Sequence, residues 1–310
     1  MSDLARIVSE TSCKLLGFDE LKLVDAHCHL DFAPDAPSIA QKGAQQSIGF
    51  FSGTVTPEGF ERAEPMLAPY SNVKVGLGLH PWWITQDSFE TGAEGESSVE
   101  RLLRLAGQTP YLNEVGLDFS SKHKHESEWQ VKAFKLLLGA LKEGSIVSLH
   151  SVKAADVVLD LLERYGAFSK ATIIFHWFSG SSDQLQRACN TGCYFSVGER
   201  FLSSKKGREY LKLIAPDKLL LETDLPAQDL SHELAQSSTQ ESTCESAQGL
   251  GQKSAHEPTH EPVCEPARKS AHEPAHEPAL DPAQECSDDA FDALCTSLKR
   301  AQDLLLKNKQ

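Results

Sequence analysis

Eight short apolar runs divide the chain, and they constrain its fold more than any other feature of the sequence. They occupy residues 21–26, 48–55, 73–79, 111–115, 146–149, 172–175, 193–197 and 218–221. Most are continuous rather than alternating, which is the pattern of parallel strands covered on both faces. Amphipathic stretches such as residues 154–165 and 183–190 separate them. This alternation predicts an α/β protein built as an eight-stranded β/α (TIM) barrel.

One of the expected helices carries its own start and stop residues. Ser127 and Gln130 have the spacing of a capping box, and Gly144 can end the helix that they open. We therefore expect a helix between the fourth and fifth strands that begins at the capping box and ends near Gly144.

The composition changes abruptly after Pro226. His-Glu-Pro begins at residues 256, 260, 272 and 276, and prolines at this spacing block both helices and strands. We expect residues 231–286 to form a disordered insertion rich in Pro, His and Glu, between a hydrolase barrel at residues 1–230 and a last helix at residues 287–310 that closes the barrel. One face of that helix gathers Phe291, Leu294, Cys295, Leu298, Ala301 and Leu305.

The formal charge of −14 argues at first against a nucleic-acid partner. Residues 227–290, however, contain 13 acidic and three basic residues, a net charge of −10 that leaves −4 for the rest. No continuous apolar run indicates a signal peptide or a membrane span. The eight cysteines are scattered, which favours reduced thiols and a cytoplasmic location.

Six potential metal ligands fall at the carboxyl ends of predicted strands, where the active sites of β/α barrels lie. His27 and His29 follow the first run, two residues apart and so expected on one side of the strand. The others end the fourth, fifth, sixth and eighth strands and are Glu114, His150, His176 and Asp224. Each alone fits a core hydrogen bond or a helix cap, but a cation would partner all six at once.

The same residues stand in motifs that resemble the TatD-type deoxyribonucleases of the amidohydrolase superfamily. The resemblance runs from about residue 22 to residue 226, in Asp-Ala-His27-Cys-His29, Gly-Leu-His80-Pro, Asn-Glu114-Val-Gly-Leu-Asp118, His150-Ser-Val-Lys153, His176-Trp-Phe and Glu222-Thr-Asp224. It implies metal-dependent hydrolysis of DNA, often from a 3′ end. It also implies that His27, His29 and Asp224 hold one divalent ion, that His150 and His176 hold a second, and that Glu114 bridges them.

Roles for the remaining polar residues stay open at this point. Asp224 is expected to act as general base. His80 either contacts phosphate or makes a structural hydrogen bond, and Glu222 either orients a ligand or forms a barrel ion pair. Lys153 stands where the family usually has Arg, so it keeps the charge without bidentate recognition. Four imidazoles suit Zn²⁺ or Mn²⁺ better than Mg²⁺, although the resemblance implies that Mg²⁺ can support activity.

Three functions remain open on the sequence: a two-metal deoxyribonuclease acting on single strands or 3′ ends, a hydrolase of another ester or amide, and a catalytically drifted scaffold that binds partners. The family usually has a substrate loop and more than one helix after the eighth strand, and here the His-Glu-Pro tract replaces most of that region. The tract is an inert linker, a weak metal binder or an acidic shield. The sequence leaves the oligomeric state open.

We expect deletion of residues 231–284, with a short Gly/Ser linker in their place, to leave the thermal midpoint nearly unchanged. Such a composition buries too little apolar surface to contribute to a packed core. Removal of its acidic residues should raise DNA affinity at low salt, and added salt should reduce the difference. Calorimetry and DNA titrations check both outcomes; failure of the deleted chain to fold would contradict the expectation.

Overall fold

The computed structural model describes residues 3–18, 21–92, 95–226 and 282–309 of the chain. Eight strands are present at the predicted places, and they pair in parallel as a three-stranded sheet, β1-β2-β3, and a five-stranded sheet, β4-β5-β6-β7-β8. Their bounds are β1 Leu23–Cys28, β2 Ile48–Gly53, β3 Val73–Gly76, β4 Tyr111–Asp118, β5 Ser145–Val152, β6 Ala171–His176, β7 Tyr194–Val197 and β8 Leu219–Leu221.

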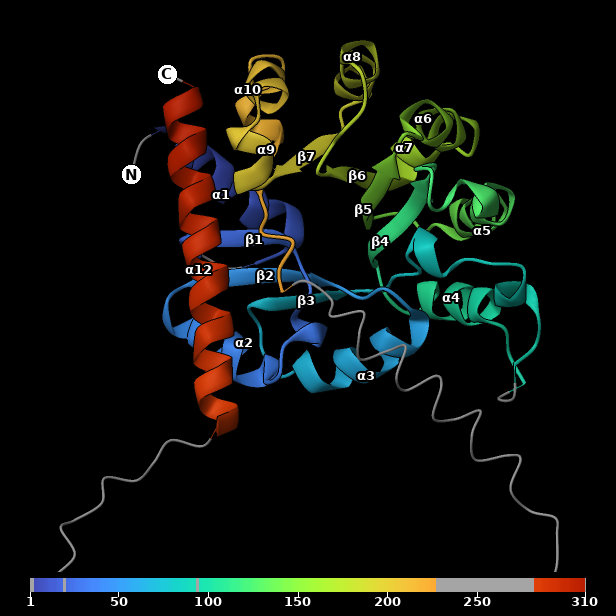
Figure 1. Cartoon of the computed structure of the whole chain (residues 1–310), viewed down its shortest axis with the longest axis horizontal. Coiled ribbons are helices and arrows are strands. Elements are labelled where there is room, and N and C mark those ends of the chain that lie inside the picture. Colours follow the sequence, from blue (N-terminus) through green and yellow to red (C-terminus); the bar gives the residue numbers. More distant parts are fainter. Residues whose placement is uncertain (1–2, 19–20, 93–94, 227–281, 310) are drawn as a thin grey trace, which may run out of the picture. The chain divides into compact units, whose positions relative to one another are not determined.

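Helices fill the connections and lie outside the strands in chain order (Figure 1). They are α1 Asp3–Leu16, α2 Ala36–Gln45, α3 Pro57–Leu67, α4 Ser98–Ala106, α5 Ser127–Ala140, α6 Ala155–Arg164, α7 Ala167–Lys170, α8 Ser182–Asn190, α9 Glu199–Ser203, α10 Lys205–Leu211 and α12 Pro282–Asn308. The described residues also contain short 3-10 turns: η1 Leu30–Phe32, η2 Pro81–Trp83, η3 Asp87–Phe89, η4 Lys124–Glu126 and η5 Pro216–Lys218. No helix in the described part combines the length and apolar composition that a membrane span needs.

The two sheets meet at two seams that differ in their bonding. An isolated parallel bridge between Leu77 and Leu112 joins the end of β3 to β4. At the other seam, backbone hydrogen bonds run from Asp224 N to His27 O and from His29 N to Leu225 O, both at 2.9 Å. The α/β architecture with parallel strands is confirmed, whereas a closed eight-stranded barrel stays a prediction.

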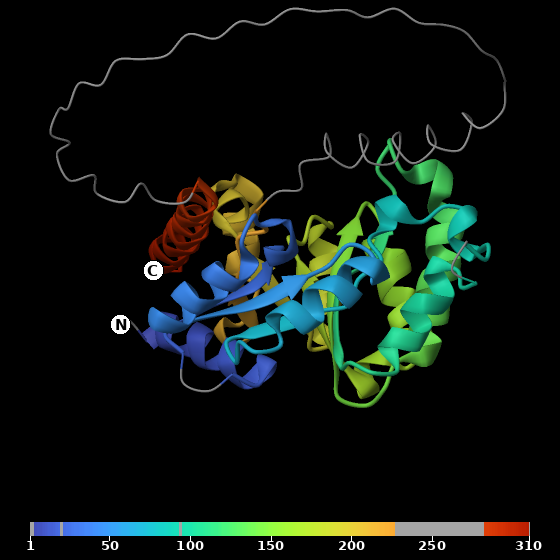
Figure 2. The same cartoon turned by 90° about the horizontal axis from the view of Figure 1, so that it is seen from below.

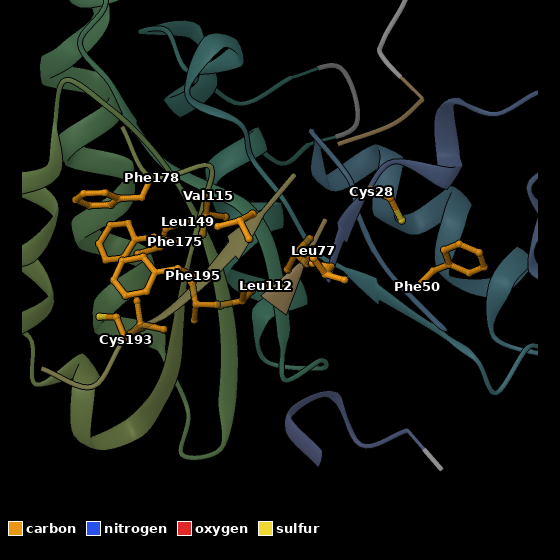
Figure 3. Close-up of a cluster of buried hydrophobic side chains, with 14 of the residues drawn as sticks. Cys28, Phe50, Leu77, Leu112, Val115, Leu149, Phe175, Phe178, Cys193 and Phe195 are labelled. Atoms are coloured by element: carbon orange, nitrogen blue, oxygen red, sulfur yellow. The ribbon is translucent and has the colours of Figure 1, made fainter. Parts of the chain in front are cut away.

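Aromatic and aliphatic side chains from both sheets fill the space between the strands and the helices (Figure 3). Phe175 and Phe195 stack with their ring centroids 6.1 Å apart, and Phe178 meets both rings edge-on. All three rings are buried, as are Leu112 and Leu149 beside them. This packing supports the strands from which the polar residues of the next section project.

The last helix confirms the predicted apolar face but begins earlier than expected. Its start is Pro282 rather than residue 287, and all six predicted face residues are buried. The helix packs against α1, α2 and α9, and the N- and C-terminal helices lie at the same side of the body in both views (Figures 1 and 2). Residues 227–281, which include most of the His-Glu-Pro tract, lie outside the described residues, so the proposed domain boundaries stay predictions.

The predicted capping box of α5 is wrong. Glu126 is the N-cap of this helix and makes no side-chain cap, while the helix ends at Ala140, before Gly144. The Gln130 side chain instead accepts a hydrogen bond from Asp118 N at 2.8 Å and donates one to His123 O at 3.2 Å. Gln130 therefore ties the end of β4 to the loop that follows it, a tertiary role that competes with capping.

A bulge in β4 aims Glu114 away from the regular pattern of the strand. Asn113 pairs with Ser148 and Val115 with Leu149, so Glu114 is an extra residue opposite β5, with a left-handed backbone (φ 66°). Gly116 follows at φ 138°, where a Cβ atom would lie 2.1 Å from the carbonyl oxygen of His150. The bulge thus depends on a glycine that lets β4 approach β5 closely.

We expect Gly116→Ala to lower the free energy of unfolding by about 3 kcal/mol, because the methyl group meets backbone atoms and the φ angle is strained. Gly139→Ala in α5 is the matched control: its Cβ would come no closer than 3.9 Å to another residue, and alanine favours the helix. Urea unfolding of both variants checks this. Equal stabilities would show that β4 accommodates the methyl group by a shift.

Candidate metal centre

The six predicted ligands converge at the carboxyl ends of the strands. Four come from the strands themselves, and the other two lie just after β1 and β8. Five are buried, and the Asp224 side chain is 30% exposed. Their donor atoms fall into overlapping groups within 4.8 Å, which also take in His80 and Glu222. The six predicted ligands are His27, His29, Glu114, His150, His176 and Asp224.

Glu114 lies at the centre of this cluster. Its Oε1 is 2.9 Å from His27 Nε2 and 3.0 Å from His176 Nε2. Its Oε2 is 2.9 Å from His80 Nε2 and 3.8 Å from His150 Nδ1. The two oxygens of one carboxylate therefore face different histidines, which is the arrangement that a bridging ligand needs.

One side of the cluster combines His27 and His29 with Asp224. Asp224 Oδ1 lies 3.4 Å from His29 Nε2 and 3.7 Å from His27 Nε2. His29 Nδ1 is 3.0 Å from the carbonyl oxygen of Gly53, which can only accept, so Nδ1 carries a proton and Nε2 faces the cluster. His27 is held by Ser148 Oγ, 3.0 Å from its Nδ1.

The other side combines His150 and His176. His150 Nε2 lies 3.1 Å from Asp118 Oδ2, and Trp82 Nε1 donates to the same oxygen at 2.7 Å. This leaves His150 Nδ1 facing the cluster, 3.4 Å from His176 Nε2. A carboxylate behind a histidine fixes its tautomer and increases its basicity as a metal ligand.

His80 is placed to donate a hydrogen bond. Its Nδ1 accepts the N–H of Trp82 at 3.1 Å, and burial lowers its pKa to about 4, so the ring is neutral. The remaining proton must then lie on Nε2, which points at Glu114 Oε2. The sequence left phosphate contact and a structural hydrogen bond open for His80, and this geometry favours the hydrogen bond.

The carboxylates make the cluster attractive to cations. Burial lowers the pKa of His29 and His176, but Asp224 and Glu114 outweigh it and raise both to about 9. Burial raises the pKa of Glu114, yet its interactions with His80, His176 and His27 hold it well below its usual range. An environment that stabilises protons on buried imidazoles also stabilises metal ions in their place, so the donor set fits divalent cations.

Two more polar residues singled out in the sequence lie at different places. Glu222 is buried and accepts from Trp177 N at 3.2 Å and from Ser196 Oγ at 2.5 Å, so it braces β6 and β7 rather than forming an ion pair. Burial raises its pKa to about 8. Lys153 follows β5 with an exposed side chain and takes no part in the cluster.

Comparison with known proteins agrees with the geometry. Residues 24–261 match the family model described as TatD related DNase. The chain belongs to this TatD family. It is 28% identical over 216 residues to the uncharacterised metal-dependent hydrolase YjjV of Escherichia coli, covering 68% of this chain and 82% of YjjV. It is 31% identical to the 3′-5′ ssDNA/RNA exonuclease TatD of Erwinia amylovora, covering 63% and 75%.

Solved structures show the same fold. The crystal structure of E. coli YjjV superposes with a TM-score of 0.50 at 23% identity, covering 92% of this chain and 95% of that one. A TatD family hydrolase from Entamoeba histolytica gives a TM-score of 0.54 at 18% identity, covering 66% and 74%. The TIM-barrel-like arrangement of parallel strands is therefore shared with structures of the TatD family.

Sequence reasoning gave no role to two buried carboxylates of this TatD-family site. Asp118 orients His150, and it stood in the Asn-Glu-Val-Gly-Leu-Asp motif without an assigned function. Asp25 accepts from Thr223 N at 3.0 Å, Thr223 Oγ1 at 2.5 Å and His27 N at 3.3 Å, which links β1 to the segment after β8. Burial raises its pKa to about 7. In the sequence, only its position two residues before His27 indicated a role for Asp25 at the site.

We expect Asp118→Asn to weaken zinc binding by roughly 10- to 100-fold, because His150 loses the carboxylate that fixes its ring. Asp156→Asn is the matched control: this exposed α6 residue accepts from Gln184 and lies outside the cluster. Competition with a chromophoric chelator measures both affinities. Equal affinities would mean that His150 does not depend on Asp118 for metal binding.

Proposed function

We propose that this chain is a metal-dependent deoxyribonuclease that binds two divalent cations and hydrolyses phosphodiester bonds of DNA. The position of Glu114 carries the proposal, because its carboxylate contacts His27 on one side of the cluster and His150 and His176 on the other, at the carboxyl ends of the strands. The reaction class follows the family, whose members include a human protein named deoxyribonuclease TATDN3 and exonucleases named TatD. The preference for single strands and 3′ ends is proposed from those names.

The proposed ligands divide into two groups around Glu114. His27, His29 and Asp224 hold the first cation, and the grouping of their donor atoms with Glu114 within 4.8 Å supports this. His150 and His176 hold the second, supported by the 3.4 Å separation of their inward nitrogens. A shared carboxylate reduces the repulsion between two cations about 4 Å apart. Because imidazoles dominate the set, we propose Zn²⁺ or Mn²⁺ as resident ions, with Mg²⁺ able to support activity.

Asp224 is the carboxylate that can meet the attacking water. Its side chain is 30% exposed, whereas that of Glu114 is 3% exposed. Burial raises the pKa of Asp224, but the hydrogen bond from His29 and the neighbouring imidazoles lower it by more than burial raises it. The net pKa is below the usual value, so the group is ionised. Asp224 therefore accepts the proton of the water as general base. Two bound cations would lower the pKa of water and offset charge on the phosphoryl oxygens.

The decisive experiment is hydrolysis of a labelled single-stranded oligonucleotide by the full chain, stripped of metal and reloaded with Zn²⁺, Mn²⁺ or Mg²⁺. We expect shortened products with metal and none with EDTA, and a 5′ label should reveal stepwise loss from the 3′ end. Absence of cleavage with every metal would refute the proposal. Turnover of a carboxylic ester or amide instead would indicate a different hydrolase, and inactivity on all substrates would indicate a drifted scaffold.

Substitution of the two central carboxylates separates their roles. We expect Glu114→Gln to deplete both cations, since it contacts both groups of histidines. Asp224→Asn should retain about one cation per chain while lowering turnover by roughly 100- to 10,000-fold, because the base is lost. Asp217→Asn removes the same charge from an exposed 3-10 turn and should match the wild type. Metal analysis and kinetics give the answer; equal metal loss in the Glu114 and Asp224 variants would contradict this division.

A further inference from the structure

A cleft of about 470 Å³ opens beside the proposed metal centre, and the proposed chemistry uses only its edge. Asp224 and Glu222 line it together with residues of α9, the segment after β8 and Ser297 of α12. Its volume lies in the range of pockets that enclose small ligands. Because Asp224 belongs to both the cleft and the cluster, a group bound in the cleft lies next to the reacting bond.

Arg200 supplies an unused cation in this cleft. It lies in α9 with an exposed side chain, and its guanidinium carbon is 4.7 Å from the centroid of the Trp177 ring. Within the described residues Arg200 has no carboxylate partner, and its neighbour Glu199, also in the cleft wall, lies 3.9 Å from Arg300 instead. The planar fork of N–H donors on Arg200 therefore remains available to an anion.

Trp177 holds that guanidinium in place. The residue follows β6 with a left-handed backbone (φ 42°), and its N–H is bound by the buried carboxylate of Glu222 at 3.2 Å. A strained backbone fixed by a buried group is typical of functional positions. Stacking on a fixed ring restricts the long arginine side chain before any ligand arrives, which lowers the entropy that binding must offset.

We propose that Arg200, stacked on Trp177, binds a phosphate that flanks the scissile phosphodiester, so that the cleft holds one neighbouring nucleotide unit. This inference rests on the proposed function, because it needs a substrate strand with a second phosphate next to the one that is cleaved. Arginine matches phosphate geometry bidentately. The hydroxyls of Ser203 and Ser297, which also line the cleft, add neutral donors for the sugar or phosphate. Arg200 is thus a binding residue for the strand beyond the cleaved bond.

The test measures binding of a fluorescein-labelled oligothymidylate to the full chain in EDTA, by anisotropy, over a range of salt concentrations. We expect Arg200→Gln to weaken binding by about tenfold and to reduce the slope of log affinity against log salt by about one. Arg200→Lys should be intermediate, since it keeps the charge and loses the fork. Arg62→Gln is the matched control, because it removes the same charge from an exposed position on α3 outside the cleft.

Two results would overturn the assignment: affinity of Arg200→Gln equal to that of Arg62→Gln, or weaker binding with an unchanged salt slope. Because binding in EDTA needs no hydrolysis, the outcome is independent of the nuclease test. A chain that binds DNA through Arg200 but cleaves none with any metal would refute the proposed function, while supporting Arg200 as a binding residue for a DNA phosphate. A chain that cleaves DNA with no contribution of Arg200 to binding would support the proposed function and overturn this inference.

Discussion

The buried carboxylate of Glu114 is the constraint on which the rest of the site depends. A charge with 3% side-chain exposure is costly unless several partners satisfy it. Four imidazoles from β1, β5, β6 and the loop after β3 surround it, and Asp118 and Ser148 in turn hold two of those rings. Loss of the central carboxylate would leave the buried nitrogens of these rings without their common partner, so the whole cluster depends on it.

The backbone stores strain at the same strand ends. Glu114, Lys153, Trp177 and Asp224 all adopt left-handed conformations, and they follow or interrupt β4, β5, β6 and β8. Such residues cost of order 1–3 kcal/mol each and persist only where the surroundings over-determine them. Here the covered parallel strands and the aromatic core beneath them provide that support. A rigid scaffold can therefore hold Glu114 and Asp224 in the cluster and Trp177 at the cleft beside it.

The sequence predicted the eight strands and the six clustered residues because both depend on local patterns. Continuous apolar runs mark covered strands, and ionisable residues at strand ends converge whatever the details of packing. It did not predict that Asp118 would orient His150, that Asp25 would bind Thr223, or that Gln130 would tie down a loop instead of capping α5. Those roles depend on which elements lie side by side, and periodicity carries no information about that. The bulge at Glu114 was hidden for the same reason.

The cleft beside Asp224 shows how distant segments combine without a fixed spacing between them. Ser297 lies more than 70 positions along the chain from Asp224, yet both line one cavity. Each end of the intervening connection is fixed independently: His29 N binds Leu225 O, and the apolar face of α12 is buried against α1, α2 and α9. Docking of α12 against these helices thus shapes the cleft, although Ser297 and Asp224 lie far apart in the sequence.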